Sequence, residues 1–164
     1  MTKTVTLSQF LARPDADDAP PNAELAPPRV TFGALAVDAA EFSGVRDKAP
    51  PGYLVREVRG TKMLTTARLF DEFAAAFQFP YYFGGNKDAF DECLRDLDDF
   101  LGEGAGYVAV VRDSAELLAE EPIERDWFAE AMRDCAAYWS RRDVLFRVVL
   151  QGDAPDLEDV SLRL

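Results

Sequence analysis

A short apolar run, Tyr107 to Val111, follows the closely spaced glycines Gly102, Gly104 and Gly106. A strand with one face in water alternates apolar and polar residues, whereas this run is apolar throughout. It therefore predicts a strand buried on both faces, which is typical of a parallel sheet covered by helices. The 164 residues of the chain allow one domain, or one domain with an appendage.

Strand-like and helix-like segments alternate from residue 53 onward. Besides the central run, the predicted strands are Tyr53–Val58 and Val144–Leu150, and the predicted helices run from Thr66 to before Pro80, from Asn86 to about Leu101, and from Asp126 to about Trp139. Thr66, Asn86 and Asp126 are residue types that cap helices. This order predicts an α/β fold in which a small three-stranded parallel sheet is covered by helices.

The first fifty residues have a different texture. Prolines interspersed with aspartates make residues 14–28 a poor helix or central strand. Two short β-like runs, Thr4–Leu11 and Arg29–Val37, flank this stretch and could pair with each other or add to a sheet edge. A second break lies at Ala49–Gly52, which reads Ala-Pro-Pro-Gly. We therefore predict a Pro-rich N-terminal extension over residues 1–50 and a main domain over residues 51–164.

The absence of histidine excludes several kinds of chemistry. Ser-His-Asp and Cys-His catalytic sites need an imidazole, and two cysteines cannot build an all-cysteine zinc site. Cys93 and Cys135 lie in apolar helical patterns and are interpreted as core thiols, and Trp127 and Trp139 as packing residues. We expect that the protein is not an enzyme and that it binds no cofactor, no metal and no small-molecule substrate.

The charge balance indicates the kind of partner. Lys and Arg number 18 and Asp and Glu 30, which gives a net charge of -12. Such a field repels phosphate backbones and anionic lipids, so we expect neither direct nucleic-acid binding nor membrane binding. The N-terminus lacks a long apolar leader and no stretch approaches the roughly 18 apolar residues of a membrane helix. A cytoplasmic location is the expectation.

The predicted helix after Asn86 carries an acidic face. Apolar residues form one stripe, and a second stripe at spacings of three or four contains Asp88, Glu92, Asp96 and Asp99. Repulsion between such carboxylates disfavours the helix, which suggests that the face serves a partner. The alternatives are a solvated surface, a divalent cation site on Asp88, Glu92 and Asp96, and a carboxylate-pair hydrolase. A single helix does not close a shell of six or more oxygens, and no carboxylate is singled out as the acid.

An aromatic, glycine-containing segment, Tyr81-Tyr82-Phe83-Gly84-Gly85, precedes this helix. Large rings beside a flexible backbone suit a binding surface, although Phe83 is interpreted as a core residue. Residues 82–94 read Tyr-Phe-Gly-Gly-Asn-Lys-Asp-Ala-Phe-Asp-Glu-Cys-Leu and resemble the signature segment of the barstar family, small intracellular inhibitors of secreted barnase-type ribonucleases. The family's fold, a three-stranded parallel sheet with helices, agrees with the predicted order of elements.

The resemblance implies a function and a set of contact residues. The partner would be a basic, secreted, guanyl-specific ribonuclease or a related toxin, and the protein a bacterial antidote or immunity protein (an antitoxin). Residues at the family's contact positions are Tyr82, Gly84, Asn86, Asp88 and Glu92, and we add Asp91 and Asp96 from the same helix. The rival hypothesis is a barstar-fold binding module for a different protein.

Two positions depart from the family's founding member. It has Asp where this chain has Glu92 and Trp where this chain has Asp91. A later acidic contact of that member matches Tyr138 most nearly, and neither Glu130 nor Asp134 is assigned its role.

Overall fold

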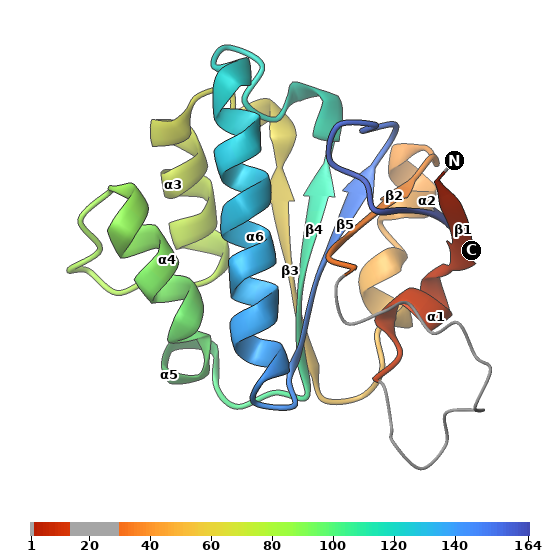
Figure 1. The fold of residues 1–164 in the computed structure, drawn as a ribbon, viewed down its shortest axis with the longest axis horizontal. Helices are drawn as coiled ribbons and strands as arrows, with labels where there is room; N and C mark the ends of the chain where they lie inside the picture. Colours follow the sequence, from red (N-terminus) through yellow and green to blue (C-terminus); the bar gives the residue numbers. More distant parts are fainter. Residues whose placement is uncertain (1, 14–29) are drawn as a thin grey trace.

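The computed structural model describes residues 2–13 and 30–164. They form a six-stranded sheet with helices on both faces (Figure 1). The strands are β1 (Lys3–Thr6), β2 (Phe32–Leu35), β3 (Tyr53–Arg59), β4 (Gly106–Arg112), β5 (Leu145–Gln151) and β6 (Val160–Arg163). The α-helices are α1 (Leu7–Leu11), α2 (Ala39–Phe42), α3 (Thr66–Ala76), α4 (Lys87–Arg95), α5 (Leu97–Leu101) and α6 (Arg125–Ser140). Four 3-10 turns complete the described elements: η1 (Val45–Lys48), η2 (Gly60–Lys62), η3 (Ser114–Glu116) and η4 (Pro122–Glu124).

The strand order is β1-β6-β2-β5-β4-β3, and all neighbouring strands are parallel. The predicted parallel arrangement of β3, β4 and β5 is confirmed, and β4 is buried along all but its last residue. The prediction of three strands is wrong, because β2, β6 and β1 extend the sheet beyond β5. Strand β6 was not predicted; it has four residues and buries only Val160 and Leu162.

The two N-terminal runs do not pair with each other. β1 lies at the edge beside β6, as one of the two predicted options allows, whereas β2 lies inside the sheet between β6 and β5. The first run also turns into α1 at Leu7, where Thr6 and Gln9 form a capping box. Residues 14–29, including the Pro-rich stretch, lie outside the described residues. The division at residue 50 stays a prediction, since strand pairing does not tell whether either part folds alone.

Each face of the sheet has its own core. Helices α1 and α2 cover one face, and α3, α4 and α6 contribute to the core of the other. Helix α6 packs directly on β5, whereas α4 packs mainly against α6. The ring of Phe90 anchors α4, lying 5.3 Å from Phe73 and 5.6 Å from Trp127 between ring centroids. The opposite side of α4 therefore faces outward.

The observed helix ends agree only in part with those predicted from the sequence. Asn86 caps α4 as predicted. The N-cap of α3 is Thr65, one residue before the predicted Thr66, and the N-cap of α6 is Glu124, two residues before the predicted Asp126. The helix predicted to run on to Leu101 instead breaks at Asp96, and α5 follows as a separate helix. No helix of the described residues is long and apolar enough to cross a membrane.

Candidate protein-binding site

The outward face of α4 carries two exposed carboxylates one helical turn apart, Asp88 and Glu92. The opposite face of the helix is held in the core by Phe90, Cys93 and Leu94. Asp88 lies in the first turn, where the helix dipole favours a negative charge. The core contacts therefore fix the backbone of α4 while the side chains of Asp88 and Glu92 stay in water.

No cation of the described residues neutralises this face. Neither Asp88 nor Glu92 takes part in the ion pairs of the described chain. The neighbouring Lys87 is directed elsewhere, because its Nζ lies 2.6 Å from Glu124 Oε2 and 5.0 Å from the centre of the Trp127 ring. Asp88 and Glu92 therefore have no ion-pair partner among the described residues.

The turn before α4 is shaped by Asn86 and two glycines. Asn86 Oδ1 accepts a hydrogen bond of 2.8 Å from the Ala89 N–H, which caps the helix. Gly85 has φ +62°, a left-handed conformation that favours glycine, and a side chain on Gly84 would approach Asn86 Nδ2 to 3.1 Å. All three residues are exposed. The turn therefore presents its backbone directly beside the acidic face.

Two tyrosines project from this turn. Tyr81 is fully exposed and Tyr82 keeps 67% of its surface exposed, and their rings pack edge to face at 5.7 Å. Phe83 points inward and packs 5.8 Å from Phe70, as the sequence analysis expected. Tyr81 was not among the predicted contact residues, because the resemblance begins one residue later. Exposed aromatic pairs of this kind are frequent anchors of protein interfaces.

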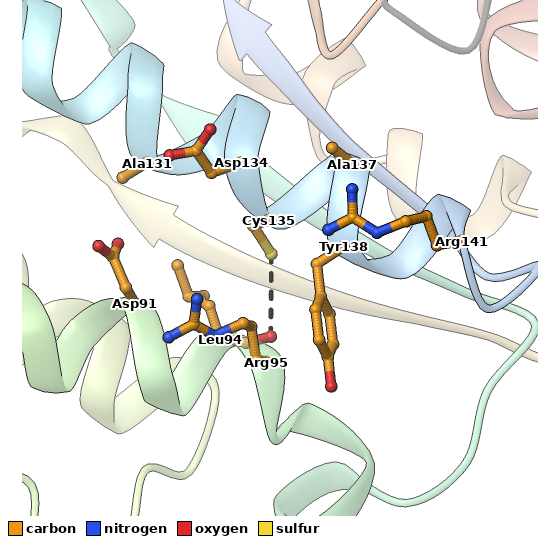
Figure 2. Close-up of a pocket in the computed structure, with 9 residues that line it drawn as sticks. All are labelled: Asp91, Leu94, Arg95, Ala131, Asp134, Cys135, Ala137, Tyr138 and Arg141. Atoms are coloured by element: carbon orange, nitrogen blue, oxygen red, sulfur yellow. Dashed lines mark hydrogen bonds between the residues drawn. The ribbon is translucent and has the colours of Figure 1, made fainter.

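A groove separates α4 from α6. It has a volume of about 240 Å³ and Asp91, Arg95, Asp134, Tyr138 and Arg141 are its polar lining residues. Figure 2 shows Asp91 across from Asp134 at one end and Arg95 and Arg141 nearer the C-terminal ends of the two helices. Buried Leu94 and Cys135 form its floor. The groove adjoins the acidic face, because Asp91 follows Asp88 by three residues and so lies next to it on the surface of α4.

Asp91 differs from the other carboxylates of α4. It is partly buried, and its buried Oδ1 has no hydrogen-bond partner. Burial raises the pKa of Asp91, and the charge of Arg95 partly offsets this. Asp134, which the sequence analysis left without a role, faces Asp91 from α6. Only the packing of the two helices brings these residues together, so no local sequence signal marks the pair.

The remaining predicted residues lie nearby but differ in setting. Asp96 is exposed at the break between α4 and α5, and the pKa of its carboxyl is raised by partial burial and by the charges of Asp99 and Asp98. Burial also raises the pKa of the Cys93 and Cys135 thiols, which agrees with core residues. Within residues 2–13 and 30–164, no group of three or more His, Cys, Asp or Glu side chains is placed to hold a metal ion.

Comparison with known families decides the relationship of the chain. A family model described as Barstar (barnase inhibitor) matches residues 53–151, which is more than half of the chain. The chain belongs to the barstar family. The barstar match runs from β3 to β5 and includes α4, the tyrosine turn and the groove, whereas β1, β2 and β6 lie outside it. Comparison with curated proteins finds no match.

Proposed function

We propose that this barstar-family protein inhibits a basic, secreted, guanyl-specific ribonuclease of the barnase type, and that it acts as an intracellular antidote. The inhibitory surface is the acidic face of α4 with the turn before it: Tyr82, Gly84, Asn86, Asp88, Asp91, Glu92 and Asp96. The observation that carries the proposal is the exposure of Asp88 and Glu92, neither of which has an ion-pair partner in the described chain.

The chemistry of a ribonuclease cleft supports this choice. An enzyme that binds RNA needs cationic donors around the phosphates, and those donors pair equally well with carboxylates. Asp88 and Glu92 offer such carboxylates on a helix fixed by core contacts, so little backbone freedom is lost on binding. A helix also contains no scissile phosphodiester. The acidic face of α4 therefore occupies the cleft and is not cleaved by the ribonuclease.

The net charge acts at longer range. A protein with a net charge of -12 attracts a basic partner before contact, which raises the association rate and makes it fall with salt. The exposed Tyr81 and Tyr82 add contact area beside the charges. The net charge thus speeds association with the partner, and the two tyrosines add contacts in the complex.

RNA cleavage by a panel of barnase-type ribonucleases tests the proposal. The 164-residue chain should inhibit at least one of them stoichiometrically. Asp88→Asn and Glu92→Gln should each weaken inhibition about tenfold or more. Asp47→Asn is the matched control, because Asp47 is exposed in η1 beneath the other face of the sheet. Binding without inhibition would favour the module with a different target. Equal weakening by the control would leave only a general charge effect.

A further inference from the structure

A positive charge stands at the start of the acidic helix. Lys87 is the first residue of α4, between the predicted contact residues Asn86 and Asp88. The only other cation of α4 is Arg95, its last residue. A basic partner that docks on Asp88 therefore also approaches Lys87, and the direction of the Lys87 side chain decides whether two positive charges meet.

Two contacts hold the ammonium group of Lys87. Its Nζ donates a hydrogen bond of 2.6 Å to Glu124 Oε2 in η4, and lies 5.0 Å from the centre of the Trp127 ring of α6. The Trp127 ring is itself packed, with centroid distances of 5.8 Å to Phe70 and 5.6 Å to Phe90. Core rings thus fix one side of the site that receives the ammonium group, and a carboxylate fixes another.

The position of Lys87 keeps its charge away from the neighbouring carboxylate of Asp91. The two residues are one helical turn apart, a spacing at which oppositely charged side chains can pair. Burial raises the pKa of Asp91, and Lys87 is not among the neighbouring charges that act on it. The side chains of Lys87 and Glu124 are 46% and 28% exposed, so water weakens their ion pair and its contribution to stability is small. Its main effect is therefore on where the positive charge lies.

We infer that Glu124 is a positioning residue for partner binding, which holds the Lys87 ammonium group toward η4 and against the Trp127 ring. The cationic groups of a basic partner then meet the carboxylates of α4 with no like charge directed at them. The inference rests on the proposed function, because it concerns a basic partner on α4. A Lys87 side chain released from Glu124 has a flexible stem that reaches toward Asp88 and Asp91. There its ammonium group competes with the partner's cations and repels them.

Binding kinetics with a ribonuclease that the 164-residue chain inhibits test this role of Glu124. Glu124→Gln releases Lys87 and should lower the association rate and the affinity about threefold or more. Lys87→Met should bind at least as tightly as the wild-type protein, because it lacks the repelling charge. In a Lys87→Met background, Glu124→Gln should therefore lower the affinity no more than a control substitution that removes one distant negative charge.

Glu120→Gln is the matched control for net charge. Glu120 is an exposed carboxylate four residues before Glu124, and it takes part in none of the ion pairs of the described residues. Both substitutions remove one negative charge, so long-range attraction alone predicts small and equal losses of affinity. Only the positioning of Lys87 predicts a larger loss in Glu124→Gln that Lys87→Met abolishes.

Three outcomes overturn the inference. A loss in Glu124→Gln no larger than that in Glu120→Gln means that Glu124 acts only through net charge, while inhibition by the wild-type protein upholds the proposed function. A loss in Lys87→Met equal to that in Glu124→Gln means that the ion pair anchors the start of α4, and that the direction of the Lys87 charge is not what matters. A wild-type protein that inhibits no ribonuclease of the panel removes the proposed function and the inference together. Circular dichroism of each variant establishes that it is folded.

Discussion

The indole N–H of Trp139 on α6 donates a hydrogen bond of 2.8 Å to the main-chain oxygen of Leu94 on α4. Leu94 is the second-last residue of α4, and its carbonyl has no further turn of helix to pair with because the chain breaks at Asp96. An indole from the neighbouring helix therefore satisfies an orphan carbonyl at a helix end. The same bond fixes how α4 lies against α6, and so the geometry of the groove.

Trp139→Phe should destabilise the protein by about 1–3 kcal/mol, because it leaves the buried carbonyl of Leu94 without its strong donor. Denaturant unfolding measures the loss. Trp127→Phe is the control, since Trp127 is only partly buried and its indole N–H makes no hydrogen bond in the described structure. Equal losses in the two variants would mean that ring volume, and not the hydrogen bond, holds the helices together.

Asp91→Asn should stabilise the protein at pH 7 by less than about 1 kcal/mol. Burial raises the folded pKa of Asp91 above its unfolded value, so ionisation of this carboxyl disfavours folding. That penalty is present at pH values above the folded pKa and disappears below the unfolded pKa, near 3.9. The gain should therefore shrink as unfolding is measured at pH values falling toward 4. Partial exposure of Asp91 keeps the effect small.

Asp156→Asn should destabilise the protein at neutral pH, in contrast to Asp91→Asn, and serves as the comparison. Arg125 Nε lies 2.6 Å from Asp156 Oδ2, and this hydrogen bond lowers the pKa of Asp156. Its ionised form contributes stability above the unfolded pKa, and that contribution is lost as the pH falls through the folded pKa. A stabilising Asp156→Asn, or a destabilising Asp91→Asn at neutral pH, would contradict the two assigned environments.

Gly33→Ala should destabilise the protein by about 1–3 kcal/mol, because a Cβ on Gly33 in β2 would lie 2.7 Å from the Leu162 side chain of β6. Thermal or denaturant unfolding measures the change. Gly44→Ala is the matched control, since the nearest atom to its Cβ would be the Glu41 oxygen at 3.5 Å. A tolerated Gly33→Ala would argue that β2 and β6 are not packed together as the sheet order requires.

Arg147→Met should leave stability unchanged or raise it by about 1 kcal/mol. Arg147 on β5 is 4% exposed, its buried Nε has no hydrogen-bond partner, and burial lowers its pKa to about 10. A buried charge with few partners lowers the stability of the folded protein. Methionine fills similar space beside Phe10 and carries no charge. Arg147→Ala should instead destabilise through the cavity that it leaves. A loss above about 1 kcal/mol in Arg147→Met would show that the guanidinium itself is needed.

The sequence predicted those features that local patterns determine. The apolar run of β4 indicated burial on both faces, and Asn86 marked the start of α4 because its side chain caps the helix. The break at Asp96 was not predictable, since the donor that satisfies the Leu94 carbonyl is Trp139, 45 residues later in the chain. Strand β6 was not predicted, because the alternation of apolar and polar residues over four positions is too short to identify a strand.

In the candidate site too, the residues that local patterns mark were predicted and those that tertiary packing brings together were not. Asp88 and Glu92 were found from spacing within one helix, and the structure places both on its outward face. The groove residues Asp134, Arg95 and Arg141 were not found, because only the packing of α4 against α6 brings them together. Tyr81 was missed because its exposure depends on the turn that points Phe83 inward.

Competition between this protein and a nucleotide for one ribonuclease tests most directly whether α4 occupies the catalytic cleft. Calorimetric titration of the most strongly inhibited barnase-type enzyme, with and without saturating guanosine 3′-monophosphate, gives the two apparent affinities. Occupation of the cleft by the acidic face of α4 predicts that the affinity falls in proportion to nucleotide occupancy. An affinity that is the same with and without the nucleotide would contradict it.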